Sequence, residues 1–262
     1  MKLYRIHAVL LRHLLLSFRV FGNVINLFYW PLLNILLWGF NSIWNQQTQE
    51  QSITVTLSLL TALMLWQLLF RLNMEISLNL NDEIQSHDFS SLFSTPLTFG
   101  EWCVAVIALG LLKSVITFFF ASITIFLLYS INVLTVGWYL IPFLFLITFT
   151  GWAVGFLTAC GIVYWGKSVH ELVWVCVWAF VPFSGIFYSV KVLPYWAQYI
   201  AAVIPQSYLF ETLRIFILHN QLPKQPLLIC LVLSILYLCG SVLFFKYSFE
   251  QSKSKGLSRL EH

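Results

Sequence analysis

Residues 53–78 read ITVTLSLLTALMLWQLLFRLNMEISL, and this stretch decides the fold class. At a rise of about 1.5 Å per residue, a helix of this length crosses a hydrocarbon core about 30 Å thick. Its two charged residues, Arg71 and Glu75, stand four apart, so they can pair on one face of a helix. The stretch therefore predicts a membrane-spanning helix with a charge pair near its inner end.

The composition extends this interpretation to the whole chain. Of 262 residues, 60% are hydrophobic and only 9% are charged, whereas soluble domains carry roughly a quarter charged residues. The apolar runs are long and continuous, unlike the alternating segments of about 10 residues in a β-barrel. We expect an all-α polytopic membrane protein whose residues 1–262 form a single transmembrane domain. The five cysteines fall in apolar runs and are expected to be core residues.

The apolar runs predict six transmembrane helices. Each run offers about 20 residues or more, which suffices to span a bilayer. Their approximate limits are 22–42, 53–78, 99–129, 137–165, 170–190 and 226–246.

The N-terminal segment 1–21 has a different pattern. Arg5, Arg12 and Arg19 recur every seven residues, and the other positions are mostly apolar. This pattern predicts an amphipathic helix that lies in the membrane interface. A signal peptide is the alternative, but Arg12 and Arg19 interrupt the apolar region and no small-residue cleavage site follows.

The distribution of Lys and Arg predicts the orientation. With both termini in the cytoplasm, the predicted cytoplasmic segments hold nine cations and the outer segments hold three, as the positive-inside rule favours. The net charge of +4 is thus explained by the membrane surface and topology rather than by nucleic acid. The nine are Lys2, Arg5, Arg12, Arg19, Lys167, Lys246, Lys253, Lys255 and Arg259, and the three are Lys191, Arg214 and Lys224.

One motif is rejected. Residues 161–168, GIVYWGKS, match the phosphate-binding loop pattern letter for letter. That loop requires a preceding strand and a soluble α/β unit, and this sequence follows an apolar span. We expect Gly166 to end a helix and Lys167 to lie among headgroups.

Two sequences predict helix starts. Thr98 and Glu101 form a capping-box pattern, and Ser168 and Glu171 form a second. Both follow short polar breaks.

The loop 79–98 between the second and third spans carries three acidic residues and no Lys or Arg, which is unusual on a cytoplasmic face. Phe89 and Leu92 are spaced to give a short helix one apolar edge. This helix is either a small interfacial helix or a docking helix for a soluble partner. The predicted docking residues are Asp82, Glu83, Asp88, Phe89 and Leu92.

Inside the third span, Lys113 has no local partner in the sequence. A lone charge in a membrane costs a few kcal/mol or more. Lys113 is expected either to extend its ammonium toward the interface or to face a watery path.

Aromatic residues make up 18% of the chain. Several fall well inside the predicted spans, and Trp174 and Trp178 stand one helical turn apart on a shared face. They either pack in the core or against lipid, or form a stacking surface for sugar rings or lipid tails. The residues predicted for a substrate path are Tyr29, Trp30, Trp152, Trp174 and Trp178.

Segment 190–225 is interrupted by prolines and is too polar for a further crossing. We expect it on the outer side, where Glu211 and Arg214, three apart, can pair. Tyr188 and Trp196 would anchor it at the interface, and Pro194 and Pro205 would start or stop short helices.

Two regions then resemble type-two ABC exporter permeases. Leu92–Leu97 (LFSTPL) followed by Glu101 is similar to their "L-L-x-T-P-L…E" region. Their last outer region, "P-x-S-G-x-x-Y-P…L-P-x-W…x-P-x-x-Y…E-x-x-R", is matched by Pro182–Tyr188, Leu193–Trp196, Pro205–Tyr208 and Glu211–Arg214. With the six-span plan, the resemblance covers essentially the whole chain.

Two departures from the family pattern stand out. Ser189 and Val190 replace the proline expected after Tyr188, and His87 and Asp88 stand where the family has an Arg/Glu-rich opening.

The resemblance implies a permease subunit that exports a glycolipid, polysaccharide or drug-like amphiphile from a bacterial inner membrane. It implies short re-entrant outer helices, a coupling helix in 79–98, a second permease copy or relative, and a separate ATPase that carries the ATP and Mg. We expect neither a cofactor nor catalysis on this chain. The alternatives are an intramembrane lipid-modifying enzyme that would need Glu75, Lys113 or Glu211, and a membrane anchor for a soluble partner.

Overall fold

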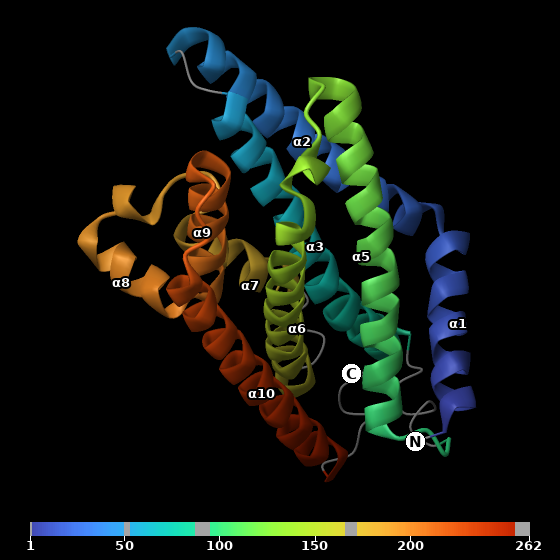
Figure 1. Ribbon diagram of the computed structural model, residues 1–262. Coiled ribbons are helices and arrows are strands. Elements are labelled where there is room, and N and C mark those ends of the chain that lie inside the picture. The colour runs from blue at the N-terminus through green and yellow to red at the C-terminus, as the bar shows by residue number, and fades with distance from the viewer. Residues whose placement is uncertain (1, 50–52, 87–94, 166–171, 255–262) are drawn as a thin grey trace.

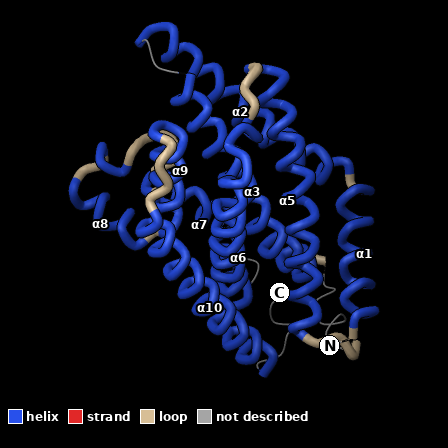
Figure 2. The backbone as a smooth tube through the Cα atoms, viewed as in Figure 1, coloured by secondary structure: helices blue, strands red, loops and turns tan. Residues whose placement is uncertain are grey.

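The computed structural model describes residues 2–49, 53–86, 95–165 and 172–254. These residues are about 90% helical and contain no strand. The helices form one bundle with α3 at its centre (Figures 1 and 2). In chain order the elements are α1 Leu3–Arg19, α2 Phe21–Gln49, α3 Ile53–Gln85, α5 Phe99–Tyr129, η1 Val133–Tyr139, α6 Leu140–Trp165, α7 Leu172–Phe180, η3 Val181–Phe183, η4 Val190–Val192, α8 Tyr195–Val203, α9 Pro205–His219 and α10 Lys224–Ser254.

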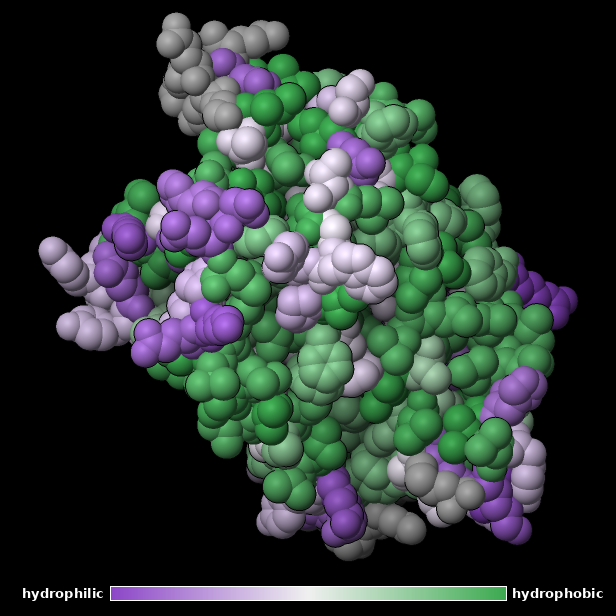
Figure 3. Space-filling model, in the orientation of Figure 1, coloured by the Kyte–Doolittle hydropathy of each residue, from purple (hydrophilic) through white to green (hydrophobic). Residues whose placement is uncertain are grey.

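Five described helices are long and apolar enough to cross a membrane, and the number rises to six if the bent pair α8–α9 counts as one. The five are α2, α3, the α5 helix, η1 with α6, and α10. Apolar side chains cover the middle of the face over α5, α6 and α10, while hydrophilic ones gather toward its ends (Figure 3). This distribution is the one expected of a multi-pass membrane protein.

The helix predicted over 170–190 is shorter in the structure. The α7 helix ends at Phe180, and a 3-10 turn over Val181–Phe183 follows it. Pro182 lies in this turn, where its ring and missing N–H prevent an α-helix from continuing. The described part of this segment is therefore too short to span a membrane by itself, and the prediction of a continuous span here is wrong.

The α3 helix forms the core because it is buried along most of its length and contacts α2, α5, α6, α7 and α9. Its closest neighbour, α6, presents Gly151 and Gly155, four residues apart, to α3. A Cβ atom at Gly151 would lie 2.9 Å from Cβ of Leu72, and one at Gly155 would lie 2.9 Å from Cδ1 of Ile76. Small residues at this spacing let two membrane helices approach closely.

The α5 helix begins with the predicted capping box. The Thr98 hydroxyl accepts from the N–H of Glu101, and the Glu101 carboxylate accepts from the N–H of Thr98. The second predicted box, Ser168–Glu171, lies outside the described residues.

The α1 helix stands beside α5 (Figure 1). At its start, the N–H of Lys2 donates to the Glu101 carboxylate at 2.7 Å, and Arg5 lies 3.6 Å from the same group and contacts the Pro96 carbonyl. These contacts hold the start of α1 against α5, and the position of this helix in the membrane interface stays a prediction.

Candidate functional site

A pocket of about 410 Å³ lies between α2, α3 and α7. Its wall contains three of the five residues predicted for a substrate path. Its volume lies in the range typical of small-molecule sites. The lining residues are Trp30, Asn34, Trp66, Gln67, Phe70, Trp174 and Trp178.

The rings of this aromatic pocket contact one another across three helices. The Trp174 ring of α7 lies 6.2 Å from Trp30 of α2 and 5.7 Å from Phe70 of α3, between centroids. Trp178, one turn further along, lies 6.5 Å from Phe70. The shared face of Trp174 and Trp178 thus points toward the α2–α3 side, and its aromatic edges and faces can pack against a ligand ring.

Two carboxamides complete the pocket. Gln67 is buried on α3, and Asn34 of α2 donates to the Trp30 carbonyl at 2.9 Å. Carboxamides can both donate and accept hydrogen bonds. A wall of flat apolar rings with a few polar groups can hold an amphiphile and fix its orientation.

The other two predicted path residues lie elsewhere. The Tyr29 ring contacts Trp30 at 5.7 Å but does not line the pocket, and Trp152 faces a separate cavity between α5, α6 and α10. Sequence reasoning missed Asn34, Trp66, Gln67 and Phe70, which follow from no motif. The available signs were Asn34 and Gln67, which are polar residues in the middle of apolar runs.

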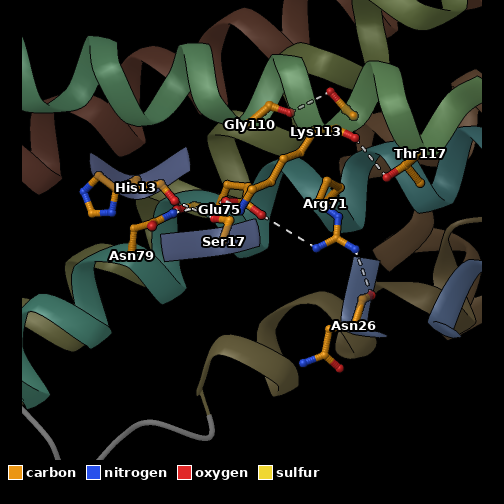
Figure 4. A network of polar contacts seen from close by, with 10 residues as sticks. His13, Ser17, Asn26, Arg71, Glu75, Asn79, Gly110, Lys113 and Thr117 are labelled. Carbon is orange, nitrogen blue, oxygen red and sulfur yellow. Dashed lines mark hydrogen bonds and ion pairs between the residues drawn. The ribbon is translucent and has the colours of Figure 1, made fainter. Parts of the chain in front are cut away.

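A buried charge cluster lies where α3, α5 and α1 meet (Figure 4). The Glu75 carboxylate accepts from Lys113 Nζ at 2.6 Å and lies 3.6 Å from the Arg71 guanidinium, as the spacing of Arg71 and Glu75 predicted. Arg71 also donates to the Asn26 carbonyl of α2 at 3.0 Å, and Asn79 donates to Glu75 at 3.2 Å. Arg71 Nε is buried without a hydrogen-bond partner among the described residues. The cluster lines none of the described pockets.

Lys113 is buried and paired, and it lines none of the described pockets. Its extension toward the interface and its exposure to a watery path both stay predictions. Its partner is Glu75, which lies 38 positions away in the sequence. Because that contact crosses from α3 to α5, no local spacing could have revealed it.

The predicted docking residues divide into two groups. Asp82 and Glu83 belong to the last turns of α3 rather than to a separate helix, whereas Asp88, Phe89 and Leu92 lie outside the described residues. Asp82 is exposed, but Glu83 is buried under α1, with Arg12 at 3.1 Å and His13 at 3.4 Å from its carboxylate.

His13 is neutral at pH 7. Burial, together with the positive charges of Arg12 and Lys113, lowers the pKa of its imidazole to about 4. Arg12 is therefore a cation that balances Glu83.

The predicted outer residues come together around α8 and α9, which meet at an angle of 99°. Arg214 donates to Glu211 at 2.8 Å and to the Gly185 carbonyl at 2.6 Å, so it ties α9 to the preceding loop. The Tyr188 hydroxyl donates to the Pro182 carbonyl at 2.7 Å, within that loop.

The prolines take the positions expected of them. Pro194 caps α8, and Pro205 is the first residue of α9. Trp196 is exposed, and its ring lies 6.2 Å from that of Phe183. The break between two short helices is therefore a property of the sequence itself.

No protein-family model matches the chain, and no curated protein matches it. Among the described residues, no group of three or more His, Cys, Asp or Glu side chains could hold a metal ion. The described part of the phosphate-loop pattern, residues 161–165, is helical and ends α6.

Proposed function

We propose that this chain is the transmembrane permease subunit of an ATP-binding-cassette exporter in a bacterial inner membrane. It moves an amphipathic substrate, such as a glycolipid, polysaccharide or drug-like molecule, and its energy comes from a separate ATPase subunit. A second copy or a relative completes the path. Both termini are cytoplasmic, and α8–α9 forms the re-entrant outer region.

The observation that carries the proposal is the aromatic pocket. Trp30, Trp174 and Trp178 were predicted for a substrate path from sequence, and they line one pocket together with buried Gln67. Rings and a carboxamide suit a substrate with both apolar and hydrogen-bonding surface.

The proposed coupling route begins in segment 79–98. Asp82 is exposed at the end of α3, so a partner protein can contact this end of the core helix. Phe89 and Leu92 provide the apolar edge to which the ATPase binds. The amphipathic N-terminal helix lies near the same partner.

Co-purification tests the proposal. The full chain, tagged at its C-terminus and isolated from its native membranes, is expected to bring down an ATPase with its own phosphate-binding loop. Phe89→Asp should reduce the recovered ATPase at least about tenfold, because a charge replaces an apolar anchor. Tyr199→Asp is the matched control, since Tyr199 is an exposed aromatic of α8.

Two results would contradict the proposal. One is the absence of any ATPase from the purified sample under conditions that preserve membrane complexes. The other is recovery of equal amounts of the ATPase with the Phe89→Asp and wild-type chains. That result would contradict docking of the ATPase on segment 79–98.

A further inference from the structure

A second cavity, of about 380 Å³, lies between the middle of α6, the middle of α10 and the bend between α8 and α9. It contains none of the residues of the aromatic pocket. Its wall is mostly apolar and includes Ala153 of α6 and Gly240 and Phe244 of α10. The Tyr237 hydroxyl donates to the Val203 carbonyl at 3.1 Å and so holds α10 against the bend.

One strongly polar side chain lies in this wall. Gln206, the second residue of α9, is only 2% exposed, and its Oε1 atom has no hydrogen-bond partner among the described residues. Buried polar atoms in folded proteins are nearly always paired, and an unpaired one costs folding free energy. The Gln206 carboxamide is therefore a group that a bound molecule could satisfy.

The cavity borders the lipid-facing side of the bundle. Among its lining residues, Leu236 is 63% exposed, Phe244 53% and Leu157 44%. Helix α10 is apolar over a membrane-spanning length and is mostly unburied by other helices. A molecule dissolved in the bilayer can thus reach the cavity sideways, without passing through water.

We propose that this cavity binds a bilayer-dissolved amphiphile with an alkyl body and one hydroxyl or amide group. The alkyl body packs against α6 and α10, and the O–H or N–H group donates to the Gln206 carboxamide. The apolar wall of the cavity favours binding of the alkyl body, and the buried Gln206 carboxamide favours a molecule that carries a hydrogen-bond donor. The site is separate from the aromatic pocket, so it does not depend on the proposed transport function.

A competition experiment tests the site. The wild-type chain in lipid nanodiscs is labelled with 1-dodecanol that carries a diazirine, and the labelled peptides are mapped by mass spectrometry. We expect labelling near Gln206 and Gly240, and we expect unlabelled 1-dodecanol to compete about fivefold better than dodecane, because only the alcohol supplies a hydrogen bond.

Two variants test separately the hydrogen bond to Gln206 and the volume of the cavity. In Gln206→Leu, 1-dodecanol and dodecane should compete equally. In Gly240→Phe, labelling of the cavity should be lost, because a Cβ atom at Gly240 meets no other atom within 4 Å and the ring has room to enter. Gly22→Phe is the control, since its surroundings are equally open and it lies outside the cavity.

Thermal unfolding of each variant confirms that it is folded before labelling is compared. The proposal is overturned if the alcohol and the alkane compete equally in the wild-type chain. It is also overturned if a folded Gly240→Phe chain is labelled as strongly as the wild type, since the probe would then sit on the general lipid surface of α10.

Discussion

At the scale of single residues, Glu75 balances the two cations buried at the centre of the bundle. Lys113 is hydrogen-bonded to it and Arg71 lies within ion-pair distance, so the three charges partly cancel inside an apolar environment. An isolated charge there would be expensive, and its partners therefore decide whether it is tolerated. The cluster connects α3 to α5 and stabilises their packing.

Glu75→Gln should lower the free energy of unfolding by about 3–5 kcal/mol, because it leaves two buried cations without a counter-ion. Lys113→Met should cost clearly less, since Arg71 still balances Glu75. Denaturant unfolding in detergent micelles measures both losses.

Lys246→Met is the control for this prediction. Lys246 lies 3.9 Å from Glu250, and both side chains are about two-thirds exposed, so the loss should stay below about 1 kcal/mol. Equal losses for Glu75→Gln and Lys246→Met would show that the buried cluster contributes no more than a surface pair.

At the scale of elements, α6 packs closely on α3 at two glycines. Gly151 and Gly155 bring the helices close enough that an added Cβ at either position would crowd α3. The Thr158 hydroxyl of α6 donates to Asn73 of α3 at 3.3 Å and adds a polar contact to the same interface.

Gly151→Ala should destabilise the chain by about 1–3 kcal/mol, because its Cβ would meet both Leu72 and the Leu69 carbonyl and force the helices apart. Gly240→Ala should be neutral or slightly stabilising, since its surroundings are open and Ala favours helix more than Gly does. Thermal unfolding followed by tryptophan fluorescence compares the two. An equal effect at both positions would contradict close packing of α6 on α3.

The long elements were predictable and the contacts between them were not. Continuous apolar runs predict α2, α3, α6 and α10 because membrane helices must be long and apolar. The capping box at Thr98 fixed the start of α5 to the residue. The short α7 was mispredicted because the apolar run continues past the point where Pro182 stops the α-helix.

Only part of the aromatic pocket was predictable, because its residues come from three different helices. Trp174 and Trp178 share a helix face, which periodicity reveals, but only the packing of three helices brings Gln67 and Trp66 to meet them. The pairing of Lys113 with Glu75 is likewise tertiary. The spacing of residues along the sequence shows which side chains share a face of one helix. It does not show which helices contact one another.

At the scale of the whole molecule, the start of α1 and the end of α10 lie at the same end of the bundle (Figure 1). The start of α5 lies there too, and the end of α3 points toward this end (Figure 1). These are the segments that the Lys and Arg distribution assigns to the cytoplasm.

Cysteine labelling tests this topology. In a chain whose native cysteines are replaced, Lys191→Cys should react with a membrane-impermeant maleimide in intact cells, because Lys191 is exposed and belongs to the predicted outer region. Asp82→Cys, exposed at the end of α3, should react only after the cells are permeabilised. The reverse labelling pattern would contradict the predicted topology. It would place the proposed docking segment outside the cell, where no cytoplasmic ATPase can contact it.

The continuity of α3 has a mechanical consequence. Its 33 residues contain neither Pro nor Gly, and the helix runs unbroken from the aromatic pocket to Asp82. Phe70 and Asp82 are separated by about 18 Å along the helix axis, with no hinge between them. Under the proposed function, a displacement of the Asp82 end by a partner protein would be transmitted to the pocket wall through one rigid helix.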